Sequence, residues 1–171
     1  MARKNQQVET RMVSEYLLNM YPKFQTLQPV PLGAIDEKLS AQVGYTKALG
    51  LSRPFRPYAD ALVILPNYII LIEAKVWNVV NGLAKLPLYK SLVPLTPELK
   101  QYMPREVLME LVVGWTNVNL EIMARDAGVR IKVYSPPWLQ DVVDRMHNYW
   151  TADYRSERAR RLEMRETLGL E

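Results

Sequence analysis

The sequence predicts an α/β domain built on a central mixed β-sheet flanked by helices. Hydrophobic spacing alternates along the chain between the period of a helix and that of a strand. Two β-rich runs separated only by Pro66-Asn67 predict a hairpin, and both runs are apolar on both faces, as in strands covered on both sides. A chain of 171 residues that is 49% hydrophobic can bury one continuous core. We therefore expect one domain, with a core over residues 1–136 and a helical extension over residues 137–171.

The first part of the chain predicts one clear element. Between residues 8 and 20, apolar side chains recur every three or four residues, which predicts an amphipathic helix that ends at Tyr21-Pro22. Residues 23–32 predict an extended segment limited by prolines. Residues 33–54 show no decisive periodicity, so a strand and a loop both remain open there.

The second part of the chain predicts the rest of the sheet and its helices. Pro66 excludes the usual primed turn, and a type I turn with a bulge would shift the hairpin register. Thr116 or Asn117 is the expected N-cap of a helix closed by Gly128, and Pro136-Pro137 ends the last strand. The expected elements are, in order, strands over 58–65 and 68–76, a helix over 82–92, a strand over 108–115, a helix to 127, a strand over 129–134 and a long C-terminal helix from 138.

Composition excludes several kinds of site. The chain has no cysteine and a single histidine, His147, which rules out disulfides, thiolate nucleophiles, cysteine-bound zinc and paired-histidine metal motifs. A metal ion would have to bind oxygen ligands. The net charge of +4 and the pI near 9.3 favour a polyanionic partner but equally fit a mildly basic protein. No uncharged apolar run reaches about 18 residues, so we expect no membrane contact and a cytoplasmic location.

The hairpin brings two carboxylates together. Counting outward from the turn, Leu65 faces Tyr68, which places Asp60 directly opposite Glu73. Strand alternation puts Lys75 on the same face. Like charges placed opposite each other are destabilising unless something neutralises them, and a bound cation would do so. The alternative is a salt-bridged trio at a sheet end, in which Lys75 satisfies both carboxylates.

These residue types suit the hydrolysis of a phosphodiester bond. Carboxylates bind hard Mg²⁺ or Mn²⁺, and such an ion stabilises charge on a phosphate and lowers the pKa of an attacking water. A lysine beside them steadies the water or the transition state. The chemistry needs no cysteine or histidine.

Asp60 on one strand and Glu73-Ala74-Lys75 on the next resemble the motif of the PD-(D/E)XK nuclease superfamily, although Ala59 stands where the motif has proline. The resemblance implies a restriction-endonuclease-like αβββαβ core and a metal-dependent DNA endonuclease or exonuclease. It further implies that Asp60, Glu73 and the backbone carbonyl of Ala74 bind Mg²⁺ or Mn²⁺ and that Lys75 is catalytic.

Many members of that superfamily add a metal-linked glutamate from the first helix. Here Glu9 and Glu15 compete. At 100° per residue, Glu9 falls in the middle of the apolar stripe and Glu15 near its edge, so we choose Glu9 as the further metal ligand. The alternative is that Glu9 only favours the helix N-terminus.

Lys85 and Tyr89 lie four residues apart on one predicted helical face. The pair resembles the glutamine-x-x-x-tyrosine signature of RecB-like nucleases, with lysine in place of glutamine. Together with Arg56, these residues are the expected nucleic-acid contacts. A surface lysine and a half-buried tyrosine are the plainer alternative.

The end of the chain suggests a second function. Arg155, Arg158, Arg161 and Arg165 recur at helical spacing, but five acidic residues accompany them, which favours a docking helix over a DNA clamp. The compact chain also resembles small nuclease-like proteins of phage head and tail modules. The alternative function is therefore a nuclease-fold adaptor of a phage virion, such as a head-tail connector, in which this helix docks onto the assembly. A homo-oligomer, including a junction-resolving dimer, also remains open.

Overall fold

The computed structural model describes residues 2–146, 156, 158–160, 163–164 and 167. The chain divides into two compact units, Met1–Tyr134 and Ser135–Glu171. The first unit contains the whole sheet and all residues of the site described below. The second contains helix α6, Pro137–Met146, which begins as expected near Trp138.

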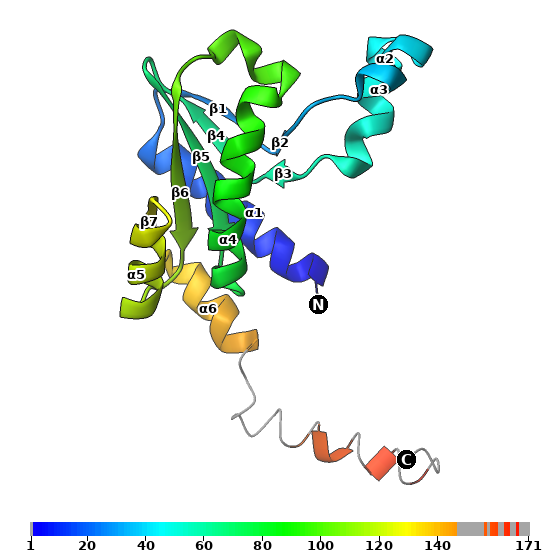
Figure 1. The fold of residues 1–171 in the computed structure, drawn as a ribbon. Helices are drawn as coiled ribbons and strands as arrows, with labels where there is room; N and C mark the ends of the chain where they lie inside the picture. The colour runs from blue at the N-terminus through cyan, green and yellow to red at the C-terminus, as the bar shows by residue number, and fades with distance from the viewer. Residues whose placement is uncertain (1, 147–155, 157, 161–162, 165–166, 168–171) are drawn as a thin grey trace. The chain divides into compact units, whose positions relative to one another are not determined.

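A five-stranded mixed sheet forms the centre of the first unit (Figure 1). Its order is β1-β4-β5-β6-β7; β1, β4 and β5 pair antiparallel, whereas β5, β6 and β7 pair parallel. The strands are β1 (Gln25–Leu27), β4 (Ala61–Ile64), β5 (Tyr68–Lys75), β6 (Glu106–Val113) and β7 (Val129–Val133). With helices on both faces, this architecture confirms the expected α/β class and its mixed sheet.

Helices cover the sheet on both faces. Figure 1 shows α4 (Val79–Leu92) in front of the sheet and α1 (Ala2–Met20) behind it. The main apolar core lies on the side of α4 and α5 (Val118–Asp126), where Leu86 and Leu120 pack in one cluster with strand side chains such as Leu71. The central strand β5 is buried from its second residue to its seventh, as its uninterrupted apolar sequence predicts.

The hairpin has the register that the sequence predicts. Ile64 pairs with Ile69 and Ala61 with Ile72, and the amide of Leu65 donates to the carbonyl of Tyr68 at 2.9 Å. Pro66 therefore does not shift the pairing. Asp60 lies one residue before β4, in a bend between that strand and β3 (Tyr58–Ala59).

The segment without a decisive sequence pattern forms two short helices, neither a strand nor a simple loop. Strand β2 (Val30–Pro31) pairs with β3, and between them run α2 (Glu37–Val43), α3 (Tyr45–Ser52) and the 3₁₀ turn η1 (Arg53–Phe55). Figure 1 shows α2 and α3 projecting beyond this two-stranded ribbon. Asp36 caps α2 by accepting from the amide of Lys38 at 2.8 Å.

The remaining boundaries follow local signals. Asn117, not Thr116, caps α5, because its side chain accepts from the amide of Leu120 at 2.9 Å. Gly128, with φ at +66°, turns the chain from α5 into β7. Two 3₁₀ turns, η2 (Val93–Leu95) and η3 (Pro97–Tyr102), connect α4 to β6. None of the described helices has the length and apolar character needed to cross a membrane.

The extent of the expected C-terminal helix lies outside the described residues, as do Arg155, Arg161 and Arg165 of the arginine stripe. Arg158 is described, and it is helical and exposed.

Candidate active site

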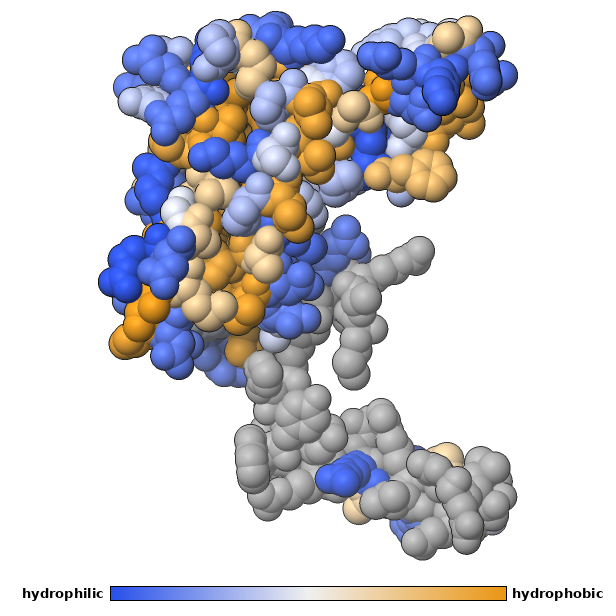
Figure 2. Space-filling model, in the orientation of Figure 1, coloured by the Kyte–Doolittle hydropathy of each residue, from blue (hydrophilic) through white to orange (hydrophobic). Residues whose placement is uncertain are grey.

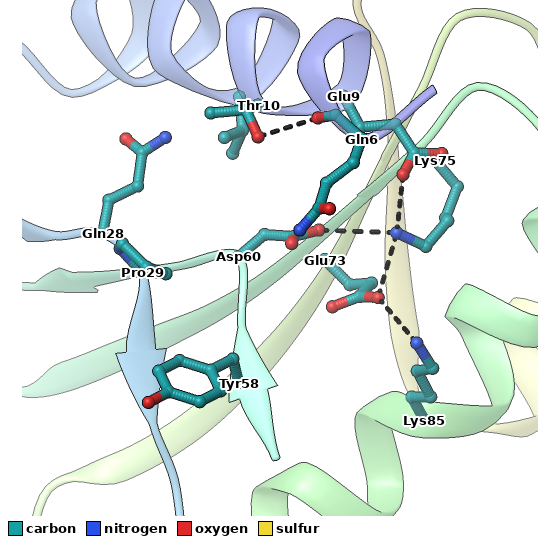
Figure 3. Close-up of a pocket in the computed structure, with 11 residues that line it drawn as sticks. Gln6, Glu9, Thr10, Gln28, Pro29, Tyr58, Asp60, Glu73, Lys75 and Lys85 are labelled. Carbon is teal, nitrogen blue, oxygen red and sulfur yellow. Dashed lines mark hydrogen bonds and ion pairs between the residues drawn. The ribbon is translucent and has the colours of Figure 1, made fainter. Parts of the chain in front are cut away.

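The ammonium group of Lys75 lies at the centre of the cluster that the sequence predicts (Figure 3). Its Nζ is 2.8 Å from the carbonyl oxygen of Ala74, 3.1 Å from Oε2 of Glu9 and 3.2 Å from Oε1 of Glu73. Oδ2 of Asp60 is 3.7 Å away. The structure thus brings together all five groups proposed for the metal and for catalysis.

Backbone amides at the end of β5 hold two of these carboxylates. Oδ2 of Asp60 accepts from the amide of Ala74 at 2.8 Å, and Oε1 of Glu9 accepts from the amide of Val76 at 3.2 Å. Asp60 enters from the bend before β4, and Glu9 from α1. Three separate segments therefore meet where β5 leaves the sheet.

Helix α1 is fixed on the sheet by a buried polar network. Glu110, in the middle of β6, is fully buried and accepts from the hydroxyl of Tyr16 at 2.6 Å and from that of Tyr21 at 3.2 Å. Burial, then hydrogen bonding and the charge of Glu110, raise the pKa of Tyr16 well above its ordinary value. These bonds set the position of the helix that carries Glu9.

The structure separates the two candidate helix carboxylates. Glu9 lies in the cluster, whereas Oε1 of Glu15 accepts from Nε of its own-helix neighbour Arg11 at 2.8 Å. Glu15 does not line the cavity beside the cluster. The choice of Glu9 from the phase of the helix therefore agrees with the observed geometry.

The surroundings of Glu73 disfavour its charged form. It is buried, and its Oε2 has no hydrogen-bond partner among the described residues. Burial, followed by the negative charge of Asp60, raises the pKa of Glu73 to about 7, although Lys75 and Lys85 act in the opposite direction. Burial acts to lower the pKa of Lys75, but the charges of Asp60, Glu73 and Glu9 raise it above its ordinary value.

A cavity of about 750 Å³ opens beside the cluster. Figure 3 shows α1 on one side, Tyr58 on the opposite side and Lys85 of α4 next to Glu73. The sequence did not point to four of the polar lining residues, two of which share a face of α1 with Glu9 at helical spacing, whereas the other two come from separate segments. These residues are Gln6, Thr10, Gln28 and Tyr58.

Gly82 is a further residue of the site, although the sequence predicts it only as the start of a helix. It lies inside α4 against the active cluster, where an added Cβ would be 2.5 Å from Cγ of Lys75 and 3.5 Å from Cγ of Glu73. Glycine in a helix interior costs roughly 1 kcal/mol relative to alanine. The absence of a side chain at this position lets α4 approach the end of β5. A glycine inside a predicted helix is the sequence signal that could have pointed to Gly82.

Two of the three expected nucleic-acid contacts lie near the cluster. Nζ of Lys85 is 3.7 Å from Oε1 of Glu73, and Lys85 lines the cavity. Tyr89 is half-buried; burial and then the charges of Glu73 and Asp60 raise its pKa. Tyr89 therefore shares the electrostatic environment of the cluster without lining the cavity.

Arg56, the third expected contact, does not lie with the others. Its guanidinium is buried and makes a bidentate ion pair with Glu98 of η3, at 2.7 and 2.8 Å. Its Nη2 also donates to the carbonyl of Pro31 at 3.1 Å. The hydrogen bond from Arg56 lowers the pKa of Glu98. Arg56 thus joins η3 to the β2–β3 ribbon and does not line the cavity beside the cluster.

The cluster offers an oxygen-only donor set for a cation. Asp60, Glu73 and the carbonyl of Ala74 supply oxygens of the kind that Mg²⁺ and Mn²⁺ prefer, and Oε2 of Glu73 is buried without a partner in the described structure. Both oxygens of Glu9 already have donors, Lys75 and Val76. Within the described part of the chain, no group of three or more His, Cys, Asp or Glu side chains is arranged to hold an ion. Asp60, Glu73 and Ala74 supply oxygens that fit a cation, and Glu9, expected as a further metal ligand, accepts from Lys75 in this structure, as the carbonyl of Ala74 also does.

A comparison with protein-family models finds no match to this chain, and a comparison with curated protein sequences finds none either. The functional assignment therefore depends on the geometry and chemistry of the site itself.

Proposed function

We propose that this chain is a metal-dependent DNA nuclease of the PD-(D/E)XK type, with a restriction-endonuclease-like core, that hydrolyses phosphodiester bonds. The observation that carries the proposal is the convergence of Asp60, Glu73, Glu9 and the carbonyl of Ala74 on the ammonium of Lys75, beside a cavity of about 750 Å³.

Charge balance favours this function over a structural salt bridge. Three carboxylates and two lysines share the site, and Glu73 still has a buried oxygen without a described partner. A cluster that only stabilised the fold would gain more from satisfying each buried oxygen. A divalent cation between Asp60 and Glu73 would neutralise the like charges and give that oxygen a partner.

Each residue has a distinct task in this proposal. A bound divalent cation supplies positive charge at the scissile phosphate and lowers the pKa of the attacking water. Asp60, Glu73 and the carbonyl of Ala74 hold that cation. Lys75 presents its ammonium to the attacking water or to the charge that develops on the phosphate. Glu9 orients Lys75 through the contact at 3.1 Å.

Lys85 adds a second positive charge at the cavity. It lies beside Glu73 at 3.7 Å, and a cation held by that carboxylate would leave the ammonium of Lys85 available to a phosphate oxygen of the substrate. A lysine placed here suits phosphate contact because its charge does not depend on the base sequence.

A cleavage assay tests the function. Purified protein is incubated with plasmid and linear DNA in Mg²⁺, in Mn²⁺ and in EDTA, and products are resolved on a gel. We expect cleavage with either ion and none with EDTA, because all the proposed ligands are oxygen atoms. Cleavage that persists in EDTA, or that no divalent ion supports, would refute the proposal.

A nuclease-fold adaptor that docks onto a larger assembly, such as a phage virion, is the second candidate. Exposed apolar side chains on α4 and at the start of α5 favour it, since such patches mark protein contact surfaces. They include Val80, Leu88 and Val118. Figure 2 shows hydrophobic residues along the front of the molecule, over α4. In this case the chain would bind a protein partner or a second copy of itself, through these side chains alone or together with its C-terminal helix. Lys75→Ala would leave that binding unchanged.

A further inference from the structure

We infer that the cavity receives one strand of DNA rather than an intact duplex, with a base next to the cleaved bond stacked on Tyr58. This inference rests on the proposed nuclease function and specifies the form of its substrate.

The depth of the reacting groups is the first argument. The side chain of Glu73 is 3% exposed and that of Lys75 is 13% exposed, so the phosphate must enter the cavity to reach them. A cavity of about 750 Å³ matches the size of sites that enclose one small molecule. One nucleotide with its phosphate fits such a space, but a base pair still held in a duplex does not. A nucleotide whose base enters the cavity with its phosphate must therefore be unpaired.

The chemistry of the walls is the second argument. Among the described residues that line the cavity, the cations are Lys75 and Lys85, and both contact Glu73. Proteins that bind duplex DNA tightly rely on many lysine or arginine contacts to phosphates. Besides these lysines, the carboxylates of the cluster and the stacking residue Tyr58, the polar lining groups are two amides and a hydroxyl, which suit the exposed base edges of a single strand. They are Gln6, Gln28 and Thr10.

Hydrogen bonds to groups of α1 hold two of the polar lining side chains, Gln28 and Thr10. Nε2 of Gln28 donates to Oγ of Ser14 at 2.8 Å, which ties the β1–β2 connection to α1. Oγ1 of Thr10 donates to the carbonyl of Gln6 at 2.8 Å. Thr10 and Gln28 are therefore positioned polar groups of the cavity wall, as hydrogen bonding to a base edge requires.

The position of Tyr58 is the third argument. Figure 3 shows its ring on the side of the cavity opposite α1, and its β3 backbone is paired with Pro31 of β2. The residue lines the cavity and is 38% exposed, which leaves part of its side chain accessible to a base. Phe55, three residues earlier and at most about 10 Å along the chain, is 87% exposed. Aromatic side chains beside a strand path are the usual means of holding single-stranded nucleic acid.

A binding experiment tests the inference directly. A fluorescently labelled single-stranded DNA 15-mer and the blunt duplex of the same sequence are titrated with the full chain, with Ca²⁺ in place of Mg²⁺, and anisotropy is recorded. We expect the single strand to bind at least about tenfold more tightly than the duplex. Tyr58→Ala should weaken single-strand binding roughly 5- to 100-fold, which is the contribution of one stacked base.

Two variants serve as controls. Tyr58→Phe keeps the ring and should bind as the wild type does, which separates stacking from loss of fold. Tyr68→Ala removes a tyrosine of similar exposure, 41%, that does not line the cavity, and it should bind unchanged. Equal binding of single strand and duplex, or an equal effect of Tyr58→Ala and Tyr68→Ala, would overturn the inference.

A cleavage comparison distinguishes this inference from the nuclease proposal. In Mg²⁺ or Mn²⁺, the single-stranded 15-mer should be cut faster than relaxed closed-circular duplex. If the closed circle is cut at least as fast, the single-strand inference fails while the nuclease function stands. If neither is cut with either ion, the nuclease function fails, and the binding arm then decides alone whether the cavity holds a single strand.

Discussion

Nζ of Lys75 lies 3.1 Å from Oε2 of Glu9, a residue 66 positions earlier in the chain. This contact links the first helix to the end of the central strand. It makes the position of the lysine depend on α1, which in turn is anchored by the bonds of Tyr16 and Tyr21 to Glu110. The geometry of the site is therefore a property of the whole fold and not of the hairpin alone.

Replacement of Glu9 should harm catalysis more than replacement of Glu15. We expect Glu9→Ala to lower the cleavage rate roughly 10- to 100-fold, as for residues that orient a metal-site group, because Lys75 loses the one of its four oxygen partners that comes from α1. Glu15→Ala removes an ion pair on α1 outside the cavity and should stay close to wild type. Cleavage rates of the two variants under one condition check this, and an equal loss would show that Glu9 does not orient the lysine.

Asp60→Asn and Glu73→Gln should each abolish cleavage without unfolding the chain. Each change removes half of a like-charge pair and leaves the shape of the side chain nearly unchanged, so thermal stability in metal-free buffer should be retained or raised. Gel assays and thermal melts of both variants make the test. If either variant is strongly destabilised, the cluster is a structural salt bridge.

The elevated pKa of Glu73 predicts a pH dependence of stability. Asp60, Lys75, Lys85 and Tyr89 surround this carboxyl group, whose pKa rises from 4.5 to about 7 in the folded chain. Between these values the folded chain holds a proton that the unfolded chain has released. Stability in metal-free buffer should therefore fall as pH rises from about 4.5 to about 7. The melting temperatures of wild type and Glu73→Gln should change differently with pH across this range. The same pH dependence in both proteins would contradict the raised pKa of Glu73.

The same proton should oppose metal binding. A carboxyl group must lose its proton to bind a divalent ion, so the apparent affinity for Mn²⁺ should rise as pH increases toward and past about 7. Calorimetric titration of the chain with Mn²⁺ at several pH values measures this. An affinity independent of pH would mean that Glu73 does not bind the ion.

Gly82→Ala should disturb the active cluster from within α4. The new Cβ would lie 2.5 Å from Cγ of Lys75, so the lysine or the helix must shift, and we expect the cleavage rate to fall roughly tenfold or more. Gly50→Ala is the matched control, since Gly50 lies inside α3 with nothing within 4 Å of an added Cβ. That variant should keep its activity and gain up to about 1 kcal/mol of stability. Equal activity of the two variants would remove the role assigned to Gly82.

The sequence predicts the hairpin register correctly because the pattern is local. Alternation along the strands and a two-residue turn fix which residues face each other, and the observed pairing of Ile64 with Ile69 agrees. The phase of α1 likewise distinguishes Glu9 from Glu15. Both predictions use only neighbouring residues and the geometry of one element.

Contacts between distant segments could not be predicted in this way. Arg56 precedes a strand and looks like a surface cation in the sequence, but it is buried against Glu98, 42 positions later. Tyr58 and Gln28 line one cavity with residues of α1, although each lies on a separate segment of the chain. The helices α2 and α3 have 7 and 8 residues, which is too short for their periodicity to be recognised.

The most direct measurement compares the cleavage rates of wild type, Lys75→Ala and Lys90→Ala on one DNA substrate in Mn²⁺, with a thermal melt of each protein. Lys75 contacts four oxygen-bearing groups of the cluster, whereas Lys90 is an exposed lysine of α4 that does not line the cavity. Lys75→Ala should lose roughly 100- to 1,000-fold in rate and remain folded, and Lys90→Ala should match the wild type. Equal rates for all three folded proteins would contradict a catalytic role for this site.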